Sequence, residues 1–388
     1  MSVYIHHIDT EVPETSYKQE FIRDLMKANV STKRGVQSII HRVYNNSGID
    51  QRHSVITDFN LNSYPPLFFE SNGKALPAAR TKARNDTYIR KAKPLFSHVA
   101  EKTIKNCQGI EKEDITHLIT VSCTGFFAPG PDFHIVKELG LDPSTQRYHI
   151  GFMGCYAAFP AIKMAAAFCE ADPDAVVLIV CLELCTLHLQ LREELDFIIS
   201  ASVFADGAAS LLISARQPHE NSQSLIIKQL GSDITPNGED DMAWTIGDFG
   251  FDMTLSTYVP DIIKSNIGQI ISNQLNSANL DKGNIDYWAI HPGGRAILDK
   301  IQQSMELSDV QVASSRKTLK EYGNMSSATI LFVLKDVIEN SVNKKDKNVM
   351  AIAFGPGLTI ETGLFELSPS LNPKRSIHQN DTARSVIS

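Results

Sequence analysis

Four short apolar runs punctuate the chain, and each one ends at turn-forming or polar residues. Nearly unbroken Val, Ile, Leu and Ala over so few residues predicts strands that are buried on both faces. Segments with helical spacing of apolar residues lie between them, namely PDFHIVKELG, PAIKMAAAFCE and ATILFVLKDVIENS. This alternation predicts an α/β fold built from layered sheets and helices. The four runs are HLITVSCTG at 117–125, DAVVLIVCLEL at 174–184, YWAIHPGG at 287–294 and NVMAIAFGPG at 348–357.

The spacing of these elements repeats along the chain. Cys155 follows the strand end at Cys123 by 32 residues, and Asn324 follows the strand end at His291 by 33 residues. The surrounding sequences, GCYAA and GNMSS, each contain a glycine, one polar or reactive side chain and two small residues that begin a helix. We interpret the repeat as an internal duplication with two similar βα units.

The duplication predicts two halves and a tail. The N-terminal half covers 1–215 and the C-terminal half covers 216–368. Each half ends in a glycine-containing segment expected to form a hairpin, at 204–214 and at 354–367. The polar residues 369–388 are expected to form a flexible extension, because they contain too few apolar side chains to pack.

Packing of the two halves would bring Cys155, His291 and Asn324 together, although they are far apart in the sequence. A cysteine with a distant histidine and asparagine is the set expected for an activated thiol nucleophile. The helix dipole would favour the thiolate, and a histidinium beside it would lower the pKa of the thiol further. The ordinary alternatives are a core-filling cysteine, a hydrogen-bonded histidine at a strand end and an asparagine that caps a helix.

Composition and charge narrow the class of protein. The 388 residues are 43% hydrophobic with a formal net charge of −7, which permits a large core and argues against a nucleic-acid partner. No signal peptide and no membrane span are evident, so we expect a cytoplasmic protein. Six scattered cysteines argue against a disulfide framework. Cys181 and Cys185 lack a second ligand pair, so we expect no metal site and assign both to the filling of a buried strand.

The motifs GFMGCYAA, AIHPGGRAILDKI, YGNMSS and FGPGLTIET occur in that order. Together they resemble the motifs of type III polyketide synthases, the chalcone-synthase-like family, over about residues 1–367. The resemblance implies a thiolase-type fold, with two duplicated βαβαβ halves in a five-layer α/β/α/β/α arrangement, and a homodimer. It also implies iterative decarboxylative condensation of malonyl-CoA onto an acyl-CoA starter, with no cofactor beyond the CoA thioesters.

The resemblance implies roles for single residues as well. Cys155 would carry the growing chain, while His291 and Asn324 would donate hydrogen bonds to the malonyl carbonyl as the enolate forms. Phe204 would stand between the CoA tunnel and the cavity and shield the enolate from water. The remaining positions are Cys123, Thr186, Trp244, Met253, Ser326, Gly355, Pro356 and Gly357 in the cavity, Arg52 at the CoA phosphates and Ala296 along the pantetheine arm.

Several of these positions have ordinary alternatives. Phe204 could be core packing, Arg52 a solvated surface charge and the loop 355–357 a plain turn. Cys123 could equally be a buried thiol at a strand end.

Three cavity positions depart from the plant members of the family. Cys123 replaces a hydroxyl residue, Met253 replaces a phenylalanine and Trp244 replaces a glycine. A tryptophan in place of glycine should fill much of one cavity lobe. The segments around Cys123 and Met253 are more similar to bacterial members, which often use aliphatic starters and make pyrones, resorcinols or phloroglucinols.

Two other functions compete with this one. The first is another thiolase-fold condensing enzyme, such as β-ketoacyl-carrier-protein synthase III or 3-hydroxy-3-methylglutaryl-CoA synthase. HPGG at 291–294 argues against the carrier-protein enzymes, which usually continue from their histidine with HQAN-like sequence. The second is a duplicated scaffold without activity, and the joint presence of Cys155, His291 and Asn324 argues against it.

Overall fold

The computed structural model describes all residues except 59–65, 71, 221, 342–345, 370–385 and 388. In the described residues the centre of the molecule is a nine-stranded mixed sheet. The strands, in the order in which they lie in the sheet, are β11 (Tyr287–Ile290), β12 (Lys347–Gly355), β13 (Thr359–Leu367), β8 (Leu225–Ile234), β1 (Tyr4–Glu11), β7 (Asp206–Ser214), β6 (Val176–Leu184), β4 (His117–Ser122) and β5 (Gln146–Gly151).

Two groups of strands in this sheet repeat one pattern. In the first group β4 and β6 are parallel, and β7 runs antiparallel to both β6 and β1. In the second group β11 and β12 are parallel, and β13 runs antiparallel to both β12 and β8. The groups meet where β1 pairs with β8. This strand order agrees with an internal duplication, while the boundary between 215 and 216 stays a prediction.

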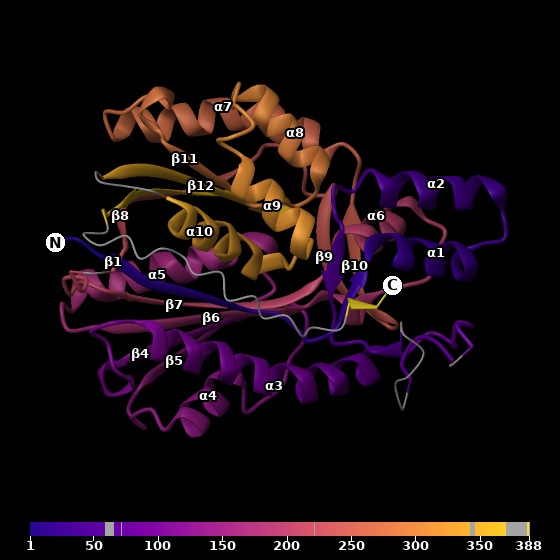
Figure 1. Cartoon of the computed structure of the whole chain (residues 1–388), viewed down its shortest axis with the longest axis horizontal. Coiled ribbons are helices and arrows are strands. Elements are labelled where there is room, and N and C mark those ends of the chain that lie inside the picture. The colour runs from indigo at the N-terminus through magenta and orange to yellow at the C-terminus, as the bar shows by residue number, and fades with distance from the viewer. Residues whose placement is uncertain (59–65, 71, 221, 342–345, 370–385, 388) are drawn as a thin grey trace.

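Helices cover both faces of each group, which gives the five layers that the resemblance implies. Figure 1 shows α3 and α4 outside the first group, α5 and α10 between the groups, and α7 and α8 outside the second. The predicted α/β class and layer order are therefore confirmed. The helices of these layers are α3 (Thr81–Asn106), α4 (Pro131–Leu139), α5 (Ala158–Ala171), α7 (Val259–Ser277), α8 (Arg295–Ser304) and α10 (Thr329–Asn340).

Burial on both faces explains the unbroken apolar sequences of β6 and β12. In β6, Val177 belongs to the central core around α5 and α10, while its neighbour Val176 packs in the core on the α3 side. In β12, Val349 belongs to the central core and Met350 packs in the core under α7 and α8. The strands predicted from apolar runs are thus confirmed as β4, β6, β11 and β12, and the predicted helices as α4, α5 and α10.

One prediction about a strand connection is wrong. The segment 204–214 is not a hairpin, because β7 is a single strand that helix α6 (Leu195–Val203) connects to β6. Gly207 lies inside this strand, where a Cβ would clash with the side chain of Met325, so the glycine serves a close contact and not a turn. The segment 354–367 does contain the predicted hairpin, between β12 and β13.

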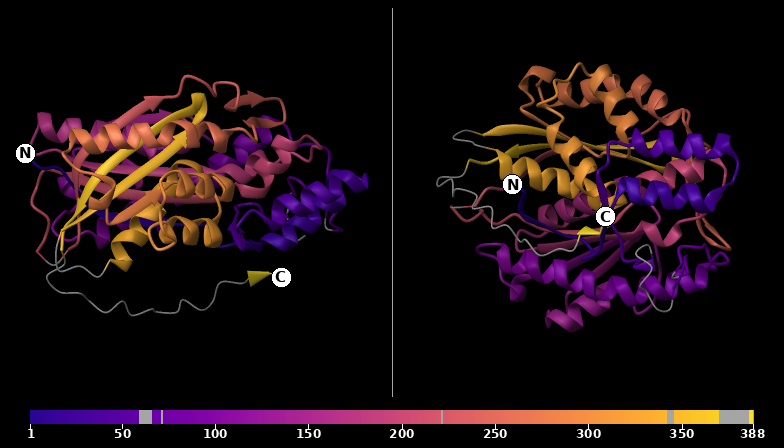
Figure 2. Two further views of the ribbon diagram at one scale, coloured as in Figure 1. Left: turned by 90° about the horizontal axis from the view of Figure 1, so that it is seen from above. Right: turned by 45° about the vertical axis from the view of Figure 1, so that its right-hand side comes forward.

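Two further helices extend the molecule at the end where β4 and β11 finish. Figures 1 and 2 show α1 and α2 projecting together at this end, beside α6 and the β9–β10 hairpin. No helix in the described part of the chain is long and apolar enough to span a membrane. Of the predicted flexible tail, 370–385 and 388 lie outside the described residues. The remaining elements are β2 (Ser16–Lys18), α1 (Gln19–Val30), α2 (Arg34–Asn45), β3 (Gln51–His53), η2 (Lys112–Asp114), η3 (Gly154–Tyr156), η4 (Cys185–His188), β9 (Met242–Gly247), β10 (Gly250–Leu255), η5 (Lys282–Asn284), α9 (Ala313–Tyr322), η6 (Ser326–Ala328), η7 (Pro356–Leu358) and β14 (Val386–Ile387).

Candidate active site

Cys155 lies in η3, the short turn of helix that leads from β5 into α5. Gly154 before it has a φ of +82°, and a Cβ at this position would clash with the ring of Pro356. Glycine therefore permits the close approach of η3 to η7. The approach closes the pocket around Cys155, which is only 8% exposed.

Asn324 occupies the corresponding place in the second half, just before η6 and α10. Its Oδ1 accepts a hydrogen bond from Ser326 N at 2.9 Å, and its Nδ2 donates to Gly293 O at 3.2 Å. Its backbone also forms a parallel bridge with Phe204 of the first half. The side-chain oxygen thus holds the first residue of η6, while the amide nitrogen carries a second hydrogen that can serve another acceptor.

Cys155, His291 and Asn324 line one pocket, which lies where the two halves meet. Five of the predicted cavity residues line it with them, and Phe204 closes one side. The structure therefore brings the predicted nucleophile and the two predicted donors together, while their catalytic roles stay predictions. The other lining residues are Cys123, Thr124, Gly154, Cys185, Phe204, Met242, Trp244, Met253, Leu255, Gly293, Ile297, Ser326, Phe354 and Pro356.

His291 is a polar residue of this pocket whose side chain forms no hydrogen bond with the described residues. It is 1% exposed, and neither ring nitrogen has a hydrogen-bond partner among the described residues. Leaving a buried polar group unpaired costs about 1–3 kcal/mol. A bound molecule that forms hydrogen bonds with the two ring nitrogens would remove this cost. Burial lowers the pKa of His291 to about 3, which makes the ring a neutral donor and acceptor at neutral pH.

The Cys155 thiol is protonated in the free protein. Burial is the largest influence and raises the pKa of Cys155 to about 11, contacts with the Ser326 and Asn324 side chains lower it, and the Glu183 carboxylate raises it. The expected lowering of this pKa by a helix N-terminus and a histidinium is therefore wrong. Because removal from water disfavours both charges, the resting pair is a neutral thiol and a neutral imidazole.

Trp244 and Met253 form the wall between this pocket and a second one. The two residues lie opposite each other on the β9–β10 hairpin and line both pockets. Trp244 Nε1 donates a hydrogen bond to Cys123 O at 2.9 Å, and its ring packs edge-on against His188 and Phe251. These contacts fix the indole in the space between the two pockets.

The second pocket is mostly apolar, and it contains Thr186, a residue predicted for the catalytic cavity that does not line it. Thr186 lies here, where its hydroxyl donates to Asp206 Oδ2 at 2.6 Å. The Thr186 hydroxyl is therefore already hydrogen-bonded within the protein, and the residue is only part of the wall of the second pocket. The lining residues are Tyr17, Ile22, Arg52, His53, Ser54, Cys185, Thr186, His188, Leu189, Gln190, Phe197, Ser200, Ala201, Phe204, Trp244, Phe251 and Met253.

Two family models together cover almost the whole described chain. The N-terminal domain of chalcone and stilbene synthases matches residues 3–217, and the C-terminal domain matches 227–368. The chain belongs to the chalcone and stilbene synthase family. Members of this family are type III polyketide synthases, so the protein is an acyltransferase of the condensing-enzyme type.

Individual relatives support this assignment. The chain is 32% identical over 336 residues to the alpha-pyrone synthesis polyketide synthase-like Pks18 of Mycobacterium tuberculosis, which covers 86% of this chain and 83% of the relative. The fold matches that of PKS-I from the brown alga Ectocarpus siliculosus, with a TM-score of 0.86, 30% identity and coverage of 94% of this chain and 98% of the other. It also matches 1,3,6,8-tetrahydroxynaphthalene synthase from Streptomyces coelicolor, with a TM-score of 0.84, 26% identity and coverage of 94% and 99%. The fold is therefore the thiolase-type fold of type III polyketide synthases.

The prediction that Arg52 of this type III polyketide synthase binds the CoA phosphates is wrong. Its side chain is buried, and Nη1 donates to Ala201 O at 2.8 Å and to Phe204 O at 2.6 Å, while Nε donates to Gln19 Oε1 at 2.9 Å. A guanidinium committed to these acceptors cannot reach a phosphate in solvent. Arg52 instead holds the backbone that presents Phe204 to the pocket.

Ala296, the other residue predicted on the CoA side, lies in a third pocket of the synthase. This pocket also contains the exposed Arg295. It shares Leu255, Gly293 and Ile297 with the catalytic pocket. The third pocket therefore adjoins the catalytic pocket from the side of α8.

The predicted stiff loop of the synthase contributes one residue to the pocket lining. Pro356 lines the catalytic pocket, whereas Gly355 packs behind it, where a Cβ would clash with the ring of Tyr156. Gly357 adopts a φ of +88° within η7, a conformation that favours glycine. The main role of the loop is therefore to pack η7 against η3, and of its residues only Pro356 lines the pocket.

The sequence did not predict that Glu183 and Cys185 lie near the reacting groups. Glu183 is fully buried and accepts hydrogen bonds from the backbone of Cys123 and the hydroxyl of Ser327. Its signal in the sequence is a single acid inside the apolar run VVLIVCLEL. Cys185, assigned to strand filling, instead lines both the catalytic and the second pocket. Within the described ranges no cluster of His, Cys, Asp and Glu side chains is arranged to hold a metal ion.

Proposed function

We propose that this synthase loads an acyl starter onto Cys155 and extends it by iterative decarboxylative condensation with malonyl-CoA. The observation that carries the proposal is the pocket in which the thiol of Cys155 lies with the unpartnered ring of His291 and the amide of Asn324. In the first step the Cys155 sulfur attacks the starter thioester. His291 accepts the thiol proton and returns it to the departing CoA thiolate, so one thioester replaces another.

Extension begins when malonyl-CoA loses CO2 in the same pocket. The electron pair of the broken carbon–carbon bond then moves onto the thioester as an enolate. Hydrogen bonds from neutral His291 and from Asn324 Nδ2 would stabilise the enolate oxygen, each by about 3–4 kcal/mol. The enolate carbon attacks the thioester on Cys155, and the Cys155 thiolate departs and takes up one proton from solvent. The longer chain, now on CoA, can load again.

The pockets on either side of Cys155 suit the two ends of the substrates. We infer that the third pocket, with Ala296, takes the pantetheine arm of CoA, because it adjoins the catalytic pocket beside Gly293. The apolar second pocket beyond Trp244 and Met253 suits an aliphatic starter chain, since burial of each CH2 is worth about 0.8 kcal/mol.

We propose a pyrone, a resorcinol or a phloroglucinol-type product, formed by cyclisation without a bound cofactor. The similarity to a relative described as an alpha-pyrone synthesis polyketide synthase-like protein favours the pyrone. The CoA thioesters themselves carry the activation, because thioester cleavage and CO2 release drive the condensation. Dialysis against a metal chelator should therefore leave the rate unchanged, and a lost rate that Mg2+ or Zn2+ restores would contradict this part of the proposal.

We also propose a homodimer, formed at the edge of the sheet. The edge strand β5 is partly exposed, and Phe126 beside it is 38% exposed. Unpaired strand edges with apolar neighbours favour association. Light scattering should give twice the mass of the chain, and Phe126→Glu should lower it; a monomer at micromolar concentration would overturn the proposal.

Product analysis tests the reaction. The purified protein is incubated with malonyl-CoA and acyl-CoA starters from acetyl to long-chain, and products are identified by mass spectrometry with Cys155→Ala as the control. Pyrone or resorcinol masses from the wild type alone support the proposal and identify the starter. Absence of CO2 release and of an acyl adduct on Cys155 with every starter would overturn it. Activity that appears only with malonyl-carrier protein would assign a carrier-protein condensing enzyme instead.

A further inference from the structure

Glu183 is a buried carboxylate directly behind the catalytic pocket. It lies near the end of β6, is fully buried, and forms no ion pair within the described part of the chain. All the hydrogen bonds that it accepts come from neutral donors. Burial of a carboxylate without a cation is costly, so the arrangement needs a reason beyond packing.

One oxygen of Glu183 holds the half of the site that carries the nucleophile. Oε2 accepts hydrogen bonds from Cys123 N at 2.9 Å and from Thr124 Oγ1 at 2.8 Å. Cys123 Sγ in turn accepts a hydrogen bond from Gly154 N at 3.1 Å. The carboxylate therefore fixes the residue that directly precedes Cys155 through one intermediate side chain.

The other oxygen of Glu183 holds the half of the site that carries the amide donor. Oε1 accepts a hydrogen bond from Ser327 Oγ at 2.6 Å. Ser327 lies in η6, whose first residue, Ser326, donates its backbone N–H to Asn324 Oδ1 at 2.9 Å. The same carboxylate thus fixes the turn that orients the Asn324 side chain.

We propose that Glu183 is a positioning residue, whose carboxylate holds the loop of Cys155 and the loop of Asn324 in a fixed relation. A carboxylate offers only acceptors, and here it receives donors from both loops. A neutral acid or an amide would turn one acceptor into a donor and release one of the loops. The proposal rests on the proposed function for the roles of Cys155 and Asn324.

The charge of Glu183 also acts on the thiol that it positions. Burial raises the pKa of Glu183 to about 7, against hydrogen bonds from Ser327, Cys123 and Thr124 that lower it. The carboxylate is therefore partly protonated at neutral pH, and a lower pH removes the acceptor that the loops require. Its negative charge raises the pKa of five titratable side chains that surround it. These are Cys123 after β4, Cys155 in η3, Cys181 in β6, Cys185 in η4 and Tyr88 in α3.

Glu183→Gln changes two readouts in opposite directions, because loss of one acceptor should slow condensation while loss of the charge should lower the pKa of the Cys155 thiol. We expect condensation to slow by about 10–100-fold in kcat, with little change in the KM for malonyl-CoA, and the acidic limb of the pH profile near pH 7 to disappear. Alkylation of Cys155 by iodoacetamide, followed by peptide mass spectrometry, should instead become about tenfold faster at a fixed pH between about 8 and 9, where the wild-type carboxylate is ionised. Damage to the fold would also speed alkylation, because it would expose the buried thiol, so the variant must first match the wild type in circular dichroism and thermal unfolding.

Two matched variants separate the role of the hydrogen bonds of Glu183 from the role of its charge. Ser327→Ala removes one donor without changing the charge, so condensation should slow while alkylation stays at the wild-type rate. Glu183→Asp, which keeps the charge but is too short to reach both loops, should behave in the same way and replaces Glu183→Gln if that variant does not fold. Unchanged condensation and an unchanged pH profile in Glu183→Gln would overturn the proposal, as would alkylation that slows together with condensation. Failure of the wild type to decarboxylate malonyl-CoA would overturn the proposed function alone, since alkylation needs no substrate.

Discussion

The two halves of the molecule build the same local structure and finish it with different chemistry. In the first half, β4 ends before Cys123, and a helix begins just after Cys155. In the second half, β11 ends before His291, and a helix begins just after Asn324. The first half thus supplies sulfur and the second supplies nitrogen donors at equivalent places. In the proposed reaction the first half therefore loads the starter and the second half stabilises the enolate.

The halves also differ in how far their polar groups are already satisfied. In the first half His188 is buried and fully paired, because Nε2 donates to Thr124 O at 2.8 Å and Nδ1 accepts from Phe251 N at 3.0 Å. His291 in the second half is also buried, but neither of its ring nitrogens has a hydrogen-bond partner among the described residues. A paired histidine stabilises the wall, whereas an unpaired one is reserved for a ligand.

The largest effect should come from Cys155→Ala, which removes the chemistry of the first half alone. Starter loading and extension should fall by at least about 10^4-fold, as for the loss of other catalytic nucleophiles. Decarboxylation of malonyl-CoA should persist, because His291 and Asn324 are untouched. Intact-protein mass spectrometry measures loading and CO2 release measures decarboxylation. Starter that remains bound to the variant as a thioester would place the nucleophile elsewhere.

His291→Ala should give the opposite pattern. Loss of one donor to the enolate should slow decarboxylation by about 10^2–10^3-fold, while Cys155 should still accumulate starter, more slowly because the proton acceptor is gone. The matched control is His188→Ala, which should lower the free energy of unfolding by about 1–3 kcal/mol without a comparable loss of decarboxylation. If decarboxylation survives in His291→Ala, the division of labour between the halves is wrong.

The sequence predicts what depends on local pattern and spacing. Strands such as β6 and β12 are evident because both faces are buried, and the meeting of Cys155, His291 and Asn324 follows from a repeated spacing and specific motifs. Burial of a single polar side chain is set by partners far away in the chain, which is why Arg52 is misassigned. The error in the pKa of Cys155 has the same origin, because desolvation depends on the closed pocket and not on the neighbouring residues in sequence.

Trp244→Gly tests whether the indole separates the catalytic pocket from the second pocket. Removal of the indole would widen the connection between the catalytic pocket and the second pocket, so kcat/KM for long acyl-CoA starters relative to acetyl-CoA should rise by about tenfold or more. Stability should fall by about 2–4 kcal/mol, because a cavity replaces a large ring. Trp244→Phe keeps a ring and loses only the bond to Cys123 O, so it should retain the wild-type preference. Equal starter profiles in Trp244→Gly and the wild type would show that the indole is not the barrier.

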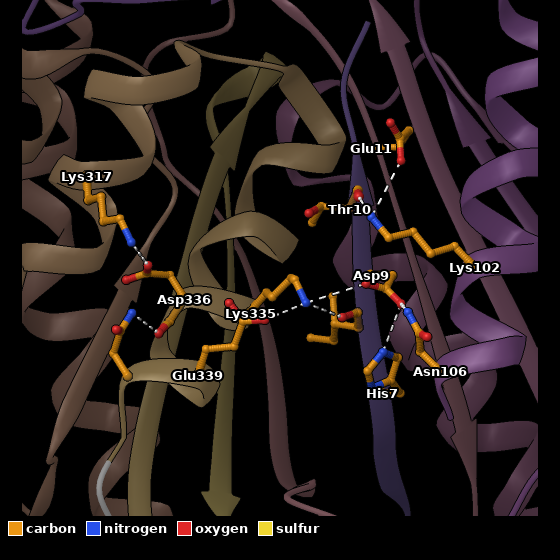
Figure 3. Close-up of polar contacts among 12 residues, drawn as sticks. His7, Asp9, Thr10, Glu11, Lys102, Asn106, Lys317, Lys335, Asp336 and Glu339 are labelled. Carbon is orange, nitrogen blue, oxygen red and sulfur yellow. Dashed lines mark hydrogen bonds and ion pairs between the residues drawn. The ribbon is translucent and has the colours of Figure 1, made fainter. Parts of the chain in front are cut away.

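The smallest effect concerns the junction between the halves. Asp9 on β1 lies between α3 and α10 (Figure 3), where its carboxylate accepts hydrogen bonds from His7 at 2.9 Å and Asn106 at 2.8 Å and lies 3.5 Å from Lys335 Nζ. Burial raises the pKa of Asp9, but the hydrogen bonds from His7 and Asn106 and the charge of Lys335 together lower it to about 2. Because the folded pKa lies below the unfolded value, ionised Asp9 stabilises the fold above about pH 4, and this contribution is lost as the pH falls towards 2.

Asp9→Asn should therefore lower the free energy of unfolding at pH 7 by about 2 kcal/mol, with little change in condensation. The difference from the wild type should shrink between pH 4 and pH 3, as measured by urea unfolding. Asp336→Asn is the matched control, since Asp336 forms a more exposed ion pair with Lys317 and points away from Asp9 (Figure 3). Such pairs contribute less than about 1 kcal/mol. Equal losses in the two variants, or a difference independent of pH, would mean that buried charge at this junction does not hold the two halves together.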